Sequence, residues 1–137
     1  MLMTNPQTYV PDRPLLRGYS HLVGAIVAPF GLLALLLVAD SSRGIVGGAI
    51  FGSSLIIRYS TSAIYHLFPL GRRLRALVRR LDHSSIFVFI AATYTPFALM
   101  LMSNGWGIPL LSVVAGLAVA GVVVSLAVPV ASRWIRV

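Results

Sequence analysis

The feature that most constrains this sequence is a series of long apolar stretches that contain almost no charged residues. Residues 22–39 carry no charged side chain, and with the apolar residues before them they supply about the 20 residues that a membrane-spanning helix needs. Charged residues make up only 10% of the chain, whereas about 25% is usual in a soluble domain. We therefore expect an all-α, polytopic transmembrane helix bundle with about four spans. The expected spans are residues 15–39, 44–68, 82–102 and 108–131.

The N-terminal segment differs from the rest of the chain. Residues 1–14 are mostly polar and are interrupted by Pro6, Pro11 and Pro14, so we expect a flexible tail on the cytoplasmic side. A cleaved signal peptide is the alternative, because arginines precede the first apolar run. That run is long for a signal peptide, however, and further spans follow it. The sequence has no convincing internal repeat, and residues 15–137 are expected to form one transmembrane domain.

The basic residues predict the orientation in the membrane. All eleven are arginines, and nine of them lie in the N-terminal tail, the second loop and the C-terminus. The first loop contains only Arg43, and Arg58 lies inside a span. The positive-inside rule then places both termini in the cytoplasm of a multi-pass cell-membrane protein. The net charge of +8 is best explained by contact with the lipid bilayer, and no nucleic acid partner is expected.

Small residues at regular spacing indicate which helix faces pack against protein. Gly44, Gly48 and Gly52 are four residues apart, a spacing that lets helix backbones approach closely in lipid. His66 follows Gly52 by fourteen residues, which returns it to within roughly 40° of the same face. His66 is therefore expected to point toward protein. The same small-residue spacing recurs in the last span, at Ser112, Gly116 and Ala120.

Alternating spans bring several polar residues to the cytoplasmic side. These are His21 at the start of the first span, Ser62 and His66 at the end of the second, and Asp82 and His83 at the start of the third. The Ser62 hydroxyl lies one turn from His66 on the same face, where it could orient the imidazole. A purely structural interpretation stays open, because histidines often lie in the headgroup zone and Asp82 could cap a helix or pair with arginines.

Arg58 lies near the middle of the second span, where an unpaired arginine is costly. It is eight residues, or roughly 12 Å, from His66 along the helix. Asp82 is the one intramembrane counter-charge that the sequence offers. Extension of Arg58 toward the headgroups and pairing with another chain are the alternatives.

Three motifs in order resemble the haemolysin III branch of the progestin and adipoQ receptor (PAQR) family. They are Arg17-Gly18-Tyr19-Ser20-His21, then Ser62-Ala63-Ile64-Tyr65-His66, then Arg80-Leu81-Asp82-His83-Ser84-Ser85-Ile86-Phe87 running into Ala91-Ala92-Thr93-Tyr94-Thr95-Pro96. The resemblance implies seven transmembrane helices with a cytoplasmic N-terminus. It also implies a zinc ion near the cytoplasmic face, held by the histidine of a Ser-x-x-x-His motif and by two histidines of the seventh helix.

The resemblance carries over to this chain only in part. Ser62 and His66 match the Ser-x-x-x-His motif, and Asp82 matches an aspartate near the family's zinc. No residue matches the seventh-helix histidines, so we expect a C-terminally truncated form or one half of an assembly. With no cysteine in the chain, Zn²⁺ would need nitrogen and oxygen ligands. His66 is the expected metal ligand, and His21 and His83 are candidate substitutes for the missing ones.

Two functions follow as hypotheses from the resemblance. In the first, the parent fold is a zinc-dependent hydrolase of amide or ester bonds in lipids, in which Asp82 accepts a proton from the attacking water and Ser62 assists. In the second, the protein is not an enzyme but oligomerises through its small-residue faces and perturbs membranes, as the haemolysin name suggests. Arg58 lining a wet pore would suit this second hypothesis.

Overall fold

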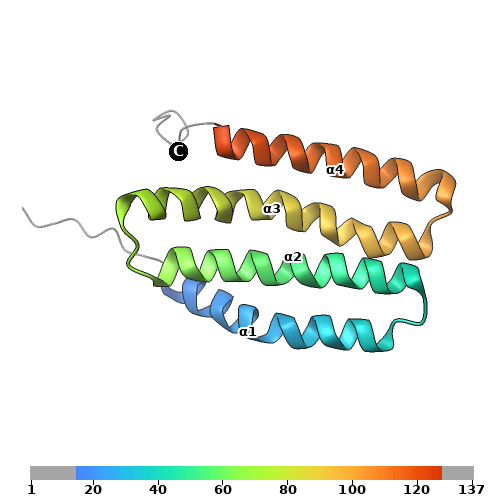
Figure 1. Ribbon diagram of the computed structural model, residues 1–137, viewed down its shortest axis with the longest axis horizontal. Helices are drawn as coiled ribbons and strands as arrows, with labels where there is room; N and C mark the ends of the chain where they lie inside the picture. Colours follow the sequence, from blue (N-terminus) through green and yellow to red (C-terminus); the bar gives the residue numbers. More distant parts are fainter. Residues whose placement is uncertain (1–14, 128–137) are drawn as a thin grey trace, which may run out of the picture.

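The computed structural model describes residues 15–127 and contains four α-helices there. They are α1 (Leu15–Val38), α2 (Ser42–Leu67), α3 (Arg72–Leu101) and α4 (Asn104–Ala127). Short connections make successive helices antiparallel, and Figure 1 shows them side by side in chain order. Within this part of the chain each helix contacts only its neighbours in sequence. The expected all-α bundle is confirmed, with α2 and α3 in the middle and α1 and α4 at the edges.

The helices have the dimensions of membrane spans. α1, α3 and α4 are each long and apolar enough to cross a bilayer. α2 is more polar but has 26 residues, about 39 Å of helix, and lies between two of these spans. Many of its small and polar residues are buried against its neighbours. Its buried residues are Gly44, Gly47, Gly48, Gly52, Ser54, Ser62, Ala63 and His66. Because these side chains avoid lipid, α2 can be less apolar than the helices at the edges, and the chain is that of an integral membrane protein.

The start of α3 differs from the expected boundary. The sequence suggested a basic loop before a span that begins at Asp82, whereas α3 begins at Arg72 and continues to Leu101. Arginine and leucine are good helix formers, so the basic segment forms the first turns of the helix. The connection between α2 and α3 is therefore short, and the polar ends of both helices are held close together.

Glycines set the distances between the helices. A Cβ atom at Gly52 would lie 2.6 Å from Leu32 in α1, and one at Gly47 would lie 2.8 Å from the Pro96 Cα atom in α3. α2 can approach both neighbours only because these positions lack side chains. The expectation that the glycine face of α2 packs against protein is confirmed. In α4, by contrast, a Cβ atom at Gly116 would meet nothing within 4 Å.

Candidate functional site

Polar side chains from three helices gather at one end of the bundle. The antiparallel order brings the start of α1, the end of α2 and the first half of α3 to this end, as Figure 1 shows. Ser62, His66 and Asp82 are all buried. We call His21, Ser62, His66 and Asp82 the polar cluster.

His21 and Ser62 form the shortest polar contact between α1 and α2. The Nδ1 atom of His21 lies 2.6 Å from the hydroxyl oxygen of Ser62, and Ser62 is only 1% exposed. The His21 ring also meets Tyr59 edge to face, with 5.5 Å between the ring centroids. The Ser62 hydroxyl is therefore buried and paired with a histidine of the neighbouring helix.

Arg58 and Asp82 form an ion pair between α2 and α3. The Nη1 atom of Arg58 donates to Oδ1 of Asp82 over 2.7 Å, and the side chains are 18% and 11% exposed. This is the one ion pair within residues 15–127. Of the alternatives that the sequence left open for Arg58, the structure has the pair with Asp82. Ser85 adds a local contact, because its hydroxyl donates to the main-chain oxygen of Asp82 over 2.7 Å.

His66 is buried where α1 crosses the end of α2. The residue is 9% exposed, and its ring meets Tyr65 edge to face at 4.9 Å between the centroids. A Cβ atom at Gly18 of α1 would lie 3.2 Å from the Cβ atom of His66. Gly18 thus lets the backbone of α1 cover this histidine, and His66 points toward protein as expected from its spacing to the glycines.

His83 does not join the polar cluster. Its side chain is exposed, and its Nδ1 atom pairs with the main-chain oxygen of Arg79 one turn earlier, over 2.8 Å. Adjacent residues on a helix point about 100° apart, so the buried position of Asp82 leaves His83 on the outer surface. Of the two candidate substitute ligands, only His21 lies near His66 and Ser62.

The polar cluster does not make a complete metal site from residues 15–127. No group of three histidine, aspartate or glutamate side chains in this range is arranged to hold a metal ion. Asp82 is engaged by Arg58, and the Nδ1 atom of His21 is engaged by Ser62. A zinc ion with three protein ligands would therefore need side chains from elsewhere.

Comparison with known proteins assigns the family. Residues 9–137 match the model of the family described as Haemolysin-III related. The chain belongs to this family. It is 34% identical over 107 residues to the Hemolysin-3 homolog of Bacillus subtilis (strain 168), covering 76% of this chain and 50% of that protein. It is 29% identical over 124 residues to Hemolysin-3 of Bacillus cereus, covering 88% of this chain and 56% of that protein. No solved structure matches the chain significantly.

The haemolysin III-related chain thus spans about half the length of the curated relatives that it matches. The resemblance seen in the three motifs is confirmed at the level of this family, while membership of the wider PAQR family stays a prediction. The described part of this haemolysin III-related protein contains the polar cluster, built on α1, α2 and α3.

Two features of the site were not expected from the sequence. One is the bond between His21 and Ser62, and the other is the role of Gly18 and Gly24 as contact points of α1 with α2. A Cβ atom at Gly24 would lie 2.9 Å from the Tyr59 ring. The sequence contained one indication of this contact. Gly18, His21 and Gly24 are three residues apart, so they share one face of the helix.

Proposed function

We propose that this haemolysin III-related protein carries one part of a hydrolytic site for amide or ester bonds of membrane lipids. The observation that carries the proposal is the convergence of His21, Ser62, His66 and Asp82 from three helices at one buried end of the bundle. Buried polar groups are costly to maintain in a membrane, and they are usually functional there. We propose that this site lies on the cytoplasmic side of the cell membrane, because the positive-inside rule favours that side for the basic start of α3.

Each member of the polar cluster has a chemical role in this proposal. In the tautomer in which the Nδ1–H group of His21 donates to the Ser62 oxygen, the Ser62 hydroxyl can donate its own hydrogen bond to a substrate carbonyl. Asp82 is paired through Oδ1 with Arg58, which leaves Oδ2 to take up a proton from an attacking water. His66 contributes a ring nitrogen at the same end of α2.

Zn²⁺ is the metal that the family resemblance implies, and residues 15–127 do not supply a full set of ligands for it. We propose that His66 is the contribution of this part of the protein. The remaining ligands would come from further helices or from a second copy of the chain. Side-chain nitrogens are suitable zinc ligands, and a His66 ligand would need a partner for its second nitrogen.

The test is elemental analysis of protein purified in detergent, with the wild type beside His66→Ala and His83→Ala. The proposal expects about one zinc per chain or per assembly, lost in His66→Ala and retained in His83→Ala. His83 is a matched control because it is exposed and pairs only with its own helix. Absence of zinc from the wild type would refute the metal assignment.

The hydrolytic activity needs its own assay, with fluorogenic lipid amides and esters in mixed micelles. Turnover that falls in Ser62→Ala, while Ser112→Ala keeps it, would support the role of the polar cluster. Ser112 is exposed on α4 and lies far from the cluster in sequence. Equal activity of wild type and Ser62→Ala would refute the role given to this hydroxyl.

A second function is favoured by the free face of α4. Ser112, Gly116 and Ala120 are exposed, and Gly116 has open space around it, so a second helix could approach closely there. A non-enzymatic, oligomerising and membrane-perturbing protein would use such a face. Its pore would not be lined by a free Arg58, because that side chain pairs with Asp82. Dye release from liposomes tests this function, and leakage should fall in Gly116→Leu if it is correct.

A further inference from the structure

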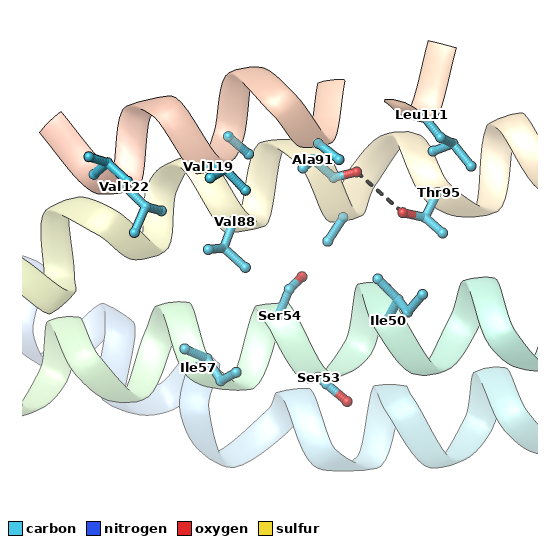
Figure 2. A pocket seen from close by; sticks show the side chains of 14 residues that line it. Ile50, Ser53, Ser54, Ile57, Val88, Ala91, Thr95, Leu111, Val119 and Val122 are labelled. Atoms are coloured by element: carbon cyan, nitrogen blue, oxygen red, sulfur yellow. Dashed lines mark hydrogen bonds between the residues drawn. The ribbon is translucent and has the colours of Figure 1, made fainter. Parts of the chain in front are cut away.

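The two sides of the helix layer differ in chemistry. On one side an apolar groove of about 690 Å³ runs along α3 between α2 and α4. Figure 2 shows Ile57 of α2 and Val122 of α4 at its edges, with Val88 of α3 between them. Two of the three hydroxyls in its lining, on Ser54 and Thr95, donate to main-chain oxygens of their own helices. A polar ligand group therefore finds little to bind in this groove.

The polar cluster is turned away from the groove. Ser62 is five residues from Ile57, which is about 140° around α2, and Asp82 is six residues from Val88, which is about 120° around α3. The side chains of Asp82 and its partner Arg58 keep 11% and 18% exposure, so the cluster is not fully closed. Recognition of a polar group is expected on this side of the layer.

Two arginines flank the polar cluster. Arg17 lies four residues before His21 in α1, and Arg75 lies seven residues before Asp82 in α3. At about 100° per residue, these spacings bring each arginine to within about 40° of the direction of that polar residue. Arg17 is exposed and Arg75 is half-buried. Both guanidinium groups are close enough to His66 for their charges to act on its ring. Two cations from opposite sides of α2 thus converge on one end of the cluster.

Contacts with α2 hold both arginines near His66. The Cζ atom of Arg75 lies 5.7 Å from the centroid of the Tyr65 ring, a distance at which a guanidinium is attracted to an aromatic ring. Tyr65 in turn meets His66 edge to face, with 4.9 Å between the ring centroids. On the other side of α2, Gly18 lets the backbone next to Arg17 pack closely on His66. The two cations are therefore placed by the fold of three helices.

The chain supplies little negative charge for these two arginines. Neither takes part in an ion pair within residues 15–127, where Arg58 and Asp82 form the single pair. The whole chain has three acids. Asp82 is engaged by Arg58, and Asp40 lies before α2 at the opposite end of the bundle. Asp12 lies outside the described residues. At most one acid of the chain is left for two arginines, so an anionic ligand group would complete them.

The depths of the arginines match the dimensions of a lipid headgroup. Along the helix axes, Arg17 lies about 6 Å beyond His21, and Arg75 lies about 10 Å beyond Asp82. The headgroup region is about 5–7 Å deep on each side of the hydrocarbon core. With the polar cluster at the edge of the core, where the acyl carbonyls of a lipid lie, the two guanidinium groups stand near the depth of its phosphate.

We propose that the substrate of this site is an acyl lipid that carries a phosphate. Arg17 and Arg75 bind the phosphate from two sides, while the ester or amide carbonyl lies at the polar cluster. Water adds to the acyl carbon, and the bond from that carbon to the lipid oxygen or nitrogen breaks. The products are a fatty acid and a phosphate-bearing alcohol or amine, which takes up the proton. The inference rests on the proposed hydrolytic function and assigns its substrate specificity to the two arginines.

Binding is tested apart from turnover, with a dialkylglycerol phosphate that has ether bonds in place of esters. Native mass spectrometry of the full chain in detergent compares it with the same dialkylglycerol without phosphate. We expect the phosphate lipid to bind more tightly. Arg17→Gln and Arg75→Gln should each weaken its binding about tenfold, the lower end of what one hydrogen bond to a charged group contributes. The corresponding lysine variants should restore part of it.

Arg73→Gln is the matched control. It removes the same charge two residues from Arg75, about 200° around α3, and Arg73 is exposed. Its binding of the phosphate lipid should equal that of the wild type. Circular dichroism checks that each variant is folded.

Turnover is tested with an acyl lipid phosphate beside the same acyl lipid without phosphate. Arg17→Gln and Arg75→Gln should raise KM for the phosphate lipid about tenfold, by loss of the same hydrogen bond. Hydrolysis of the phosphate-free lipid should stay unchanged, because neither arginine contacts it.

Several results would overturn the inference. Equal binding of the two ether lipids, or equal losses in Arg73→Gln and Arg75→Gln, would leave no defined phosphate site. Unchanged binding in both Arg17→Gln and Arg75→Gln would show that these side chains are neutralised within the protein. Displacement of the lipid by an equal concentration of inorganic phosphate would show a site for the free anion.

The same assays separate this inference from the proposed function. Hydrolysis without preference for the phosphate lipid would overturn the substrate assignment and keep the hydrolytic function. Binding that depends on both arginines, with no hydrolysis of either lipid, would refute the hydrolytic function and with it the substrate assignment, and would keep the phosphate site.

Discussion

Removal of the Asp82 carboxylate should destabilise the protein more than removal of the Arg58 guanidinium. The two groups pair over 2.7 Å, with side chains that are 11% and 18% exposed. Arg58 lies about 12 Å from His66 along α2, well inside the span. In Asp82→Asn the guanidinium would keep its charge, because arginine is not deprotonated in proteins. In Arg58→Met the remaining carboxylate lies close in sequence to Arg79 and Arg80, near the basic end of α3.

The magnitude follows from the partial burial of the pair. Breaking a buried ion pair by removing one partner typically costs 3–5 kcal/mol, and a central arginine in a transmembrane helix costs about 2.5–3.5 kcal/mol. Since the Arg58 side chain retains some exposure, we expect Asp82→Asn to lower the free energy of unfolding by about 3 kcal/mol. Arg58→Met should cost less than about 2 kcal/mol, the usual loss of one charged hydrogen bond. The double variant should lie within about 1 kcal/mol of the wild type.

The assay is unfolding by sodium dodecyl sulfate in mixed micelles, followed by circular dichroism for the wild type, both single variants and the double variant. The coupling between the two sites is obtained from this double-mutant cycle. A loss of less than about 0.5 kcal/mol in Asp82→Asn, or a double variant as unstable as that single one, would refute the reasoning that an uncompensated arginine dominates.

Three further predictions concern packing, the polar cluster and topology. Gly47→Ala should lower the free energy of unfolding in the same assay, because its Cβ atom would collide with the backbone of α3. Gly116→Ala is the control: its Cβ atom would meet nothing, so the free energy of unfolding should stay unchanged or rise by up to about 1 kcal/mol through helix propensity. Ser62→Ala should cost about 1 kcal/mol by removing the 2.6 Å contact with the histidine of α1, and an unchanged unfolding midpoint would contradict that contact. The chain has no cysteine, so a single introduced cysteine can be labelled selectively with an impermeant maleimide. Gly71→Cys should react only from the cytoplasmic side and Asp40→Cys only from the outside. The reverse pattern would overturn the orientation.

The class of the protein and several packing faces could be predicted from the sequence. Uncharged apolar runs can satisfy their backbone groups in lipid only as helices, so the all-α architecture follows from local chemistry. The spacing of Gly44, Gly48 and Gly52 likewise identified the buried face of α2. The basic segment before Asp82 was expected to be a loop but forms the start of α3, because charge marks the membrane boundary of a helix and not its first residue.

The contacts of the site depended on the tertiary structure. Asp82 was the only acid that could neutralise Arg58, but whether the two side chains meet depends on the register of α2 against α3. That register is set by contacts such as Gly47 on Pro96, far from the ion pair in sequence. His21 and Ser62 are 41 residues apart and meet only because α1 lies closely against α2.

The sequence by itself therefore determined the membrane class, the number and approximate extent of the helices within residues 15–127, and the presence of polar groups near one end of three of them. Hydrophobicity, charge and small-residue spacing are local properties that a helix expresses wherever it packs. Only the tertiary structure decided that His21 pairs with Ser62, that His83 stays outside, and that α2, α3 and α4 enclose a groove. Those outcomes depend on the rotation and axial shift of each helix against its neighbour, which are set by many contacts between distant residues at once.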